Sequence, residues 1–269
     1  MEALYNIPPL VFLIGALVLA VAFACGGQIY VHRRFPRTDF IEHNEVGGFI
    51  IAVVGSLYAV LLGFLTVVVW QHFSESREQV SREAAAAADV WHTCTGLPYK
   101  LRSHIREDME DYADIMIKEE WPAMRHGGFS TKADLVTMDA IGAVSSFKTS
   151  DARESNAQLT TQQQLAVLHD ERQRRLANND SDVSRFAWLV LFIGGLSTIS
   201  FCWLFGLHNA RVHLLMTSTV ALVVAATLVL LFELQYPFRS NIGISPDAWH
   251  GLIAHIHLME TGGQPAMRL

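Results

Sequence analysis

Residues 46–70 read VGGFIIAVVGSLYAVLLGFLTVVVW, a run of 25 residues that contains no Asp, Glu, Lys or Arg. At about 1.5 Å of rise per residue, a helix of this length crosses a hydrocarbon core about 30 Å thick. A core helix of a soluble protein has no need of so long an uncharged stretch. This segment therefore predicts a transmembrane helix.

Three other stretches are equally free of charge and long enough to cross a bilayer: residues 10–31, 186–207 and 212–232. Charged residues make up only 17% of the chain, below the roughly 25% typical of soluble proteins. The first stretch is predicted to be a permanent helix and not a secretory signal, because no Lys or Arg precedes it. The sequence predicts an all-α membrane protein with four transmembrane helices.

The polar residues divide the chain into four parts. These are a first transmembrane helix pair, a helical extramembrane insert, a second transmembrane helix pair, and a tail with a short amphipathic helix, at residues 1–70, 71–185, 186–232 and 233–269. No strand-like alternation of apolar and polar residues appears in the insert. The insert is therefore predicted to be an all-helical extension of the membrane bundle.

The first part of the insert is predicted to continue the second transmembrane helix as a stalk, because no Pro or Gly interrupts residues 71–95. Its apolar residues recur three or four positions apart and form one face: Val80, Ala84, Ala87, Trp91 and Cys94. A second helix carries such a face at Leu101, Ile105, Met109, Tyr112 and Met116.

The remaining helices of the insert have weaker patterns. A third helix is predicted over residues 131–148, with an apolar face of Leu135, Met138, Ile141 and Val144. A fourth, over residues 151–177, is rich in Gln and Arg, so we expect it to be largely exposed. The tail helix carries Trp249, Leu252, Ile253 and Ile256, which suit either docking on the bundle or lying in the membrane interface.

The second transmembrane helix carries a stripe of small residues at spacings of four, four, three and four: Gly48, Ala52, Ser56, Ala59 and Gly63. Small residues on one face allow close approach of another helix. The stripe therefore predicts either tight helix packing or a helix whose stripe, or its opposite face, borders a pore around a symmetry axis. Tyr58 and Thr66 are the other polar groups deep in this helix, and either reaches a neighbouring helix or water in a conduit.

Polar residues at the membrane edges form a second group of candidates: Asn44, Glu45 and Glu233. An ionisable group at membrane depth suggests a function, although Glu233 at the end of a span also suits contact with headgroup water. The three histidines of the tail, His250, His255 and His257, do not share one helix face, and no metal site is predicted.

Several segments resemble the bacterial bestrophin-like integral membrane family, whose function is unknown. The similarity lies in residues 44–45, 55–64, 70 and 83–84, and in residues 235–240 after the last span, and it extends over nearly the whole chain. In the last of these segments Gln235 replaces an expected acidic residue and Ser240 replaces an expected glycine. Bestrophins themselves are ring-shaped anion channels with four membrane helices per subunit, whose second helix lines an apolar neck.

The resemblance implies a homo-oligomeric ion channel that favours anions, with a pathway bordered by the second transmembrane helix. A sensor or scaffold whose helical insert binds a ligand or partner is the alternative. No catalytic or nucleotide-binding motif is present, so neither an enzyme nor a cofactor is expected. The expected partners are membrane lipids, further copies of the chain and ions, and no basic block suggests nucleic acid.

The arginines near the span ends predict the orientation. If the insert lies inside, seven of them are cytoplasmic (Arg77, Arg82, Arg172, Arg174, Arg175, Arg185, Arg239) and four are not (Arg33, Arg34, Arg37, Arg211). The positive-inside rule then favours a bacterial inner-membrane protein with a cytoplasmic insert and both termini inside.

Overall fold

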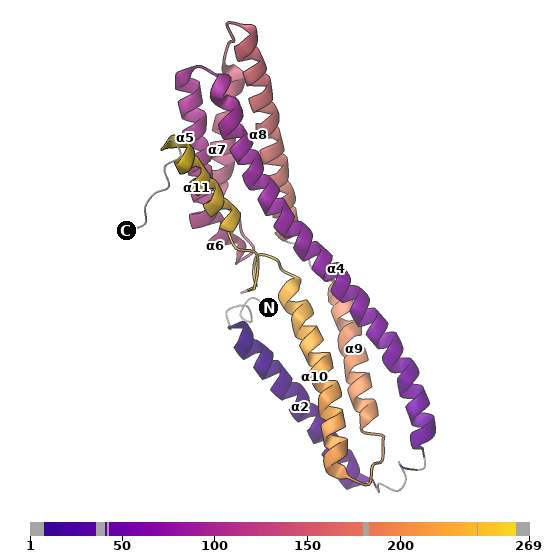
Figure 1. Cartoon of the computed structure of the whole chain (residues 1–269). Helices are drawn as coiled ribbons and strands as arrows, with labels where there is room; N and C mark the ends of the chain where they lie inside the picture. The colour runs from indigo at the N-terminus through magenta and orange to yellow at the C-terminus, as the bar shows by residue number, and fades with distance from the viewer. Residues whose placement is uncertain (1–7, 36–40, 42, 180–182, 241, 262–269) are drawn as a thin grey trace. The chain divides into compact units, whose positions relative to one another are not determined.

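The computed structural model describes residues 8–35, 41, 43–179, 183–240 and 242–261. It divides the chain into two compact units, Met1–Phe73 with Asp182–Gln235 and Ser74–Ser181 with Tyr236–Leu269. Figure 1 shows that both units are built from helices, and the described residues contain no strand. The helix α4 runs unbroken from Asn44 to Thr93 and so belongs to both units.

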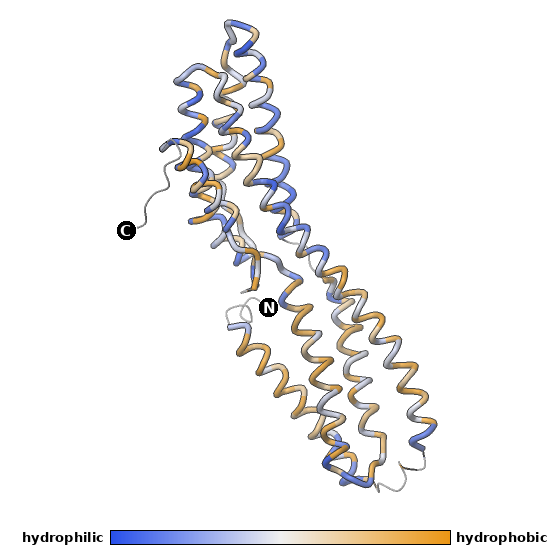
Figure 2. Tube along the Cα trace, in the orientation of Figure 1, coloured by the Kyte–Doolittle hydropathy of each residue, from blue (hydrophilic) through white to orange (hydrophobic). Residues whose placement is uncertain are grey.

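The first unit contains four helices that are long and apolar enough to cross a membrane. They are α2 (Pro9–Arg34), the first part of α4 (Asn44–Thr93), α9 (Arg185–Cys202) and α10 (Ala210–Leu234). Figure 2 shows their mainly hydrophobic colouring. Every backbone N–H and C=O must be satisfied inside the lipid, and a helix does this within one segment. The prediction of four transmembrane helices is confirmed.

The α9 helix is shorter than its apolar run, which extends to residue 207. It ends at Cys202, and the next residue, Trp203, donates a 2.9 Å hydrogen bond from its indole nitrogen to the carbonyl oxygen of Ala24 on α2. Three residues further, Gly206 exchanges hydrogen bonds with the Asn44 side chain. Hydropathy predicts where the chain is apolar, and these tertiary contacts decide where the helix ends.

The second unit is the helical insert together with the tail helix, and the prediction of a helical insert is confirmed. After α4 come a short 3₁₀ turn (Cys94–Gly96), α5 (Tyr99–Ile115), the π-helical turn η2 (Met116–Glu120) and α6 (Trp121–Met124). Then follow α7 (Thr131–Ser146), α8 (Ala152–Asn179) and the tail helix α11 (Asp247–Glu260).

The core of this unit follows the apolar faces of its first two helices. All five predicted stalk residues are buried, and four of the five on α5 and its continuation are completely buried: Ile105, Met109, Tyr112 and Met116. The tail helix docks on the same core, because Trp249 is completely buried with its ring centroid 5.5 Å from that of Tyr112. Of the two alternatives for this helix, docking is the one observed.

One expectation for the insert is wrong, and a second is incomplete. Leu135 and Met138 of α7 are exposed, and the buried face is formed instead by Ala133, Thr137, Ala140 and Val144. These small side chains let α7 lie close to α5 and α8, which the larger pair would prevent. The α8 helix, expected to be largely exposed, buries Arg172 and Arg175 completely or almost so, because carboxylates neutralise both of them.

Candidate functional site

The membrane part of α4 has one face that packs on its own chain. Its buried residues lie four, seven and four positions apart and so share one helix face: Tyr58, Leu62, Val69 and Phe73. Tyr58 is only 8% exposed and donates a hydrogen bond of 3.2 Å to the carbonyl oxygen of Leu191 on α9. Of its two expected environments, Tyr58 therefore has a neighbouring helix of the same chain.

Two glycines on α9 make room for this tyrosine. A Cβ atom built on Gly194 would lie 2.4 Å from Cδ2 of Tyr58, and one built on Gly195 would lie 3.0 Å from its hydroxyl. A side chain at Gly194 would force the Tyr58 ring to move, and one at Gly195 would require a smaller shift. The contact between α4 and α9 is thus fixed by shape as well as by a hydrogen bond.

The stripe of small residues lies on a different face of α4, and the chain does not cover it. Ala52, Ser56, Ala59 and Gly63 are exposed and Gly48 is half-buried. A Cβ atom added at Gly48 or Gly63 meets no described atom within 4 Å. Of the residues in the apolar window of each helix, 11% are buried by the chain itself in α4 and 6% in α2, against 22% in α9 and α10.

The hydroxyl groups on α4 are satisfied within the helix. Ser56 donates to the carbonyl oxygen of Ala52 at 2.6 Å, and Thr66 donates to that of Leu62 at 2.8 Å. A hydroxyl bound to the carbonyl four residues earlier is compatible with a lipid, protein or water-facing surface. The open face of α4 therefore presents small and apolar groups rather than free donors.

The three membrane-edge candidates have different environments. Asn44 holds the turn before α10, with its amide nitrogen 2.6 Å from the carbonyl oxygen of Gly206 and its amide oxygen 3.0 Å from the backbone nitrogen. Glu45 is exposed in the first turn of α4, where a negative charge complements the helix dipole. Glu233 is buried within the chain at the end of α10, not open to solvent.

The insert contains a buried network of charges that no sequence motif predicted. Arg175 of α8 is completely buried and donates two hydrogen bonds to Glu83 of α4, from Nε at 2.5 Å and from Nη2 at 3.1 Å. Its Nη2 also lies 3.0 Å from Oε1 of Glu120. The Tyr112 hydroxyl donates to Glu83 at 2.7 Å. One guanidinium thus connects α4 with the turn that precedes α6.

Arg172, one turn earlier on α8, extends the network. It donates to Glu120, to Asp134 of α7 and, at 2.9 Å, to the carbonyl oxygen of Ser130. The backbone nitrogen of Ser130 in turn donates to Glu120 at 2.6 Å. Three carboxylates and two guanidiniums therefore tie four helices of the insert to one another.

The π-helical turn puts Glu120 into this network. Pro122 has no N–H to donate to the carbonyl four residues earlier, and the backbone nitrogen of Trp121 instead donates to the carbonyl oxygen of Met116, five residues back. Such widened turns are frequent at functional positions because they change which side chain faces inward. Here the residue turned inward is an acid.

Two members of the network, Arg175 and Tyr112, have raised pKa values. Burial by itself lowers the pKa of Arg175, and the carboxylates of Glu83 and Glu120 more than offset this, so the net pKa is raised and the guanidinium stays charged. Burial, and then the negative charge of Glu83, raise the pKa of Tyr112 well above its usual value, so the phenol remains a donor. Arg175 and Tyr112 therefore both act as hydrogen-bond donors that hold α4, α5 and α8 together.

Two segments singled out in the sequence meet beside this network. Glu83 belongs to one, and residues 236–240 form the other. The ring of Phe238 lies 5.8 Å from that of Trp121, whose indole nitrogen donates to the carbonyl oxygen of Ile244 at 2.9 Å. The guanidinium of Arg175 lies 5.3 Å from the centre of the same indole ring. The sequence did hold one signal, since Glu83 interrupts an otherwise apolar helix face.

The tail histidines do not converge on a common site. His255 faces His92 of α4, with their Nε2 atoms 3.2 Å apart, while His250 is exposed on another face of α11. The described residues contain one group of three potential metal ligands, His104, Asp108 and Asp139, none of which the sequence patterns singled out.

Comparison with known proteins gives a consistent result. The sequence matches the family described as Bestrophin-like domain over residues 18–249. Two crystal structures of a bacterial bestrophin homologue from Klebsiella pneumoniae are similar to this chain, with TM-scores of 0.64 and 0.63 at 14% identity, covering 91% and 92% of this chain and 99% of theirs. A structure described as a membrane protein has a TM-score of 0.64 at 16% identity, covering 94% and 99%. Among curated proteins none matches.

Replacing Arg175 by Met should strongly destabilise the insert, because it leaves Glu83 and Glu120 buried without their main partner. Breaking a buried ion pair typically costs about 3–5 kcal/mol. The thermal unfolding midpoint of the purified protein measures this effect. Arg82→Met is the matched control, because Arg82 is exposed and pairs only with Glu78, so its loss should cost at most about 1 kcal/mol. Equal midpoints for the two variants would contradict the account.

Proposed function

Because this chain belongs to the Bestrophin-like family, we propose that several copies form a ring in the membrane and conduct ions along a pathway bordered by α4. Its membrane helices and its fold agree with this reading. The preference for anions rests on the resemblance to bestrophins. The observation that carries the proposal is the division of α4 into a face that packs on its own chain and a face that none of the described residues covers.

Two groups of exposed residues on the membrane part of α4, one of small and one of larger side chains, face in different directions around the helix. At about 100° per residue, the small-residue stripe is centred about 100° from the packed face of Tyr58 and Leu62. Larger apolar residues lie roughly opposite the packed face: Phe49, Val53, Val60 and Phe64, all exposed. In a ring each helix has a face toward its own subunit, a face toward the next subunit and a face toward the axis.

We assign the stripe to the contact with the next copy and the larger residues to the pathway. Small residues let two helix backbones approach closely, which is what a narrow ring of identical helices requires. An apolar constriction passes ions when it is wetted and blocks them when it is dry, so a lumen lined by Phe and Val is suited to gating. The insert, held together by its buried charges, then extends the ring outside the membrane.

The alternative of a sensor or scaffold requires the insert to receive a ligand or a partner. The centre of the insert is filled by side chains that bind one another, and Arg175 and Glu83, which form an ion pair there, are both completely buried. This arrangement suits a rigid support better than a binding cavity, so we favour conduction.

We also propose that the protein lies in the bacterial inner membrane with the insert and both termini in the cytoplasm. The support is the distribution of arginines, seven on the insert side against four on the other, together with the positive-inside rule. The first and last residues of the chain lie outside the described ranges, so the insert is the part to test.

A cysteine at residue 155 reports this orientation. Ser155 is exposed on α8, so the thiol of Ser155→Cys should react readily with a maleimide. We expect no labelling of intact inner-membrane spheroplasts by an impermeant maleimide and full labelling after lysis. The unsubstituted protein, whose Cys94 is buried, is the control for background from the native thiols. Labelling of intact spheroplasts would reverse the orientation.

Replacing Gly63 by Leu tests the assignment of the stripe. A Cβ atom at this position meets no described atom within 4 Å, so the fold of the single chain should survive. At a close contact between copies it leaves no room, and we expect the oligomer to dissociate in size-exclusion chromatography with light scattering. Chloride flux into reconstituted liposomes should fall with it.

Gly15→Leu is the matched control, because Gly15 is an exposed glycine of α2 with equally open space around it. It should leave both oligomer and flux unchanged. An intact oligomer with reduced flux would move the stripe from the contact to the lumen. If unsubstituted protein passes neither chloride nor potassium at any voltage or pH tried, conduction is wrong and the sensor or scaffold reading replaces it.

A further inference from the structure

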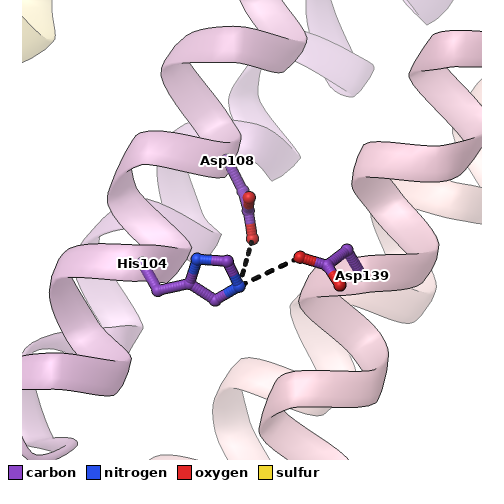
Figure 3. A group of neighbouring side chains, drawn as sticks. All are labelled: His104, Asp108 and Asp139. Atoms are coloured by element: carbon purple, nitrogen blue, oxygen red, sulfur yellow. Dashed lines mark ion pairs between the residues drawn. The ribbon is translucent and has the colours of Figure 1, made fainter.

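Three potential metal ligands meet on the insert, where α5 lies against α7. His104 and Asp108 are four residues apart on α5 and so share one helix face. Nε2 of His104 lies 3.7 Å from Oδ2 of Asp108 and 3.0 Å from Oδ2 of Asp139 on α7. Figure 3 shows both carboxylates next to the same ring nitrogen of His104, with Asp139 on the neighbouring helix.

Asp108 is the unusual member of this triad. The residue is only 8% exposed, and its Oδ2 atom is buried without a hydrogen-bond donor among the described residues. Buried carboxylate oxygens nearly always have a partner, and one without a partner requires an explanation. The distance of 3.7 Å to His104 is too long for a hydrogen bond, so the imidazole does not supply it.

Acidic side chains surround Asp108. Burial raises the pKa of Asp108 to about 6; His104 opposes the rise, while Asp139, Asp111 and Glu107 add to it. The triad therefore lies in a negatively charged part of the insert, which attracts cations.

The geometry fits a small divalent ion. With metal–ligand bonds of 2.0–2.2 Å in a tetrahedral site, neighbouring ligand atoms lie about 3.3 Å apart. The distances of 3.0 and 3.7 Å bracket this value, and the ligand atoms of all three residues lie within 4.8 Å of one another. His104 and Asp139 are partly exposed, with side-chain exposures of 43% and 66%, so solvent can supply the fourth ligand.

We propose that His104, Asp108 and Asp139 bind one divalent transition-metal ion of the zinc class, which clamps α5 to α7. One imidazole nitrogen with two carboxylate oxygens is a ligand set that zinc accepts. Calcium and magnesium require more oxygen ligands and do not favour a nitrogen. The site goes beyond the proposed channel function and does not depend on it, because its ligands all belong to the insert.

Zinc titration of the full-length, tag-free protein in detergent tests the site by isothermal calorimetry near neutral pH. The measurements use a His255→Ala background, since His92 and His255 are close enough to bind zinc themselves. We expect one zinc ion per chain and a rise in the thermal unfolding midpoint, with calcium and magnesium producing neither. The affinity should fall by about tenfold or more in both His104→Ala and Asp139→Asn, each of which removes one ligand.

Glu107→Gln is the matched control. It removes a negative charge from the exposed side of α5 near the triad, as Asp139→Asn does on α7, but takes away no ligand. Its affinity for zinc should stay near that of the parent. The proposal is overturned if the parent binds no zinc at millimolar concentration, if binding is unchanged in His104→Ala and Asp139→Asn, or if Glu107→Gln weakens it equally. Circular dichroism of each variant verifies that the helices remain.

Discussion

The requirement that every backbone polar group be satisfied inside lipid decides the rest of this structure. It makes each of the four apolar stretches a helix, and in α4 the same helix continues without a break from the membrane segment into the insert. One helix therefore presents two kinds of surface. Its membrane part leaves one face uncovered, while its second part buries an apolar face that includes Ala87 and Trp91.

The core of the insert contains buried charged side chains. Arg175 and Arg172 leave water completely or almost so, and Glu83, Glu120 and Asp134 supply the compensating charges. Such a network adds little net stability over an apolar core, but any misalignment of its helices leaves a charge unpaired. It therefore favours one arrangement of α4, α7 and α8. For a ring of identical subunits, a single defined arrangement of the supporting helices is the useful property.

The buried network explains part of the resemblance to the bestrophin-like family. Glu83 is the acceptor for both Arg175 and Tyr112, and Phe238 packs on Trp121, which also contacts Arg175. Two segments about 150 residues apart in the sequence thus contact Arg175 and Trp121, two side chains that lie against each other. The resemblance in these segments reflects the core of the insert, whereas the resemblance in residues 55–64 includes Tyr58, which fixes α4 against α9.

The sequence predicted the elements well and their tertiary partners poorly, for a simple reason. Long uncharged runs and the three-four spacing of Ile105, Met109 and Tyr112 are local patterns, and they placed the spans and the buried face of α5. Long-range pairing is not local. Nothing near Arg175 in the sequence indicates that Glu83 neutralises it, so α8 was expected to be exposed. In the same way, Asp139 belongs to the triad only because α7 lies against α5.

Native mass spectrometry of the protein released from detergent is the most direct test of the central claim, that several copies of α4 surround one axis. The account predicts a single closed assembly of more than two chains, because the uncovered stripe contacts the next copy while the face opposite Tyr58 borders the axis. A protein that remains a monomer or a dimer at every concentration would contradict it.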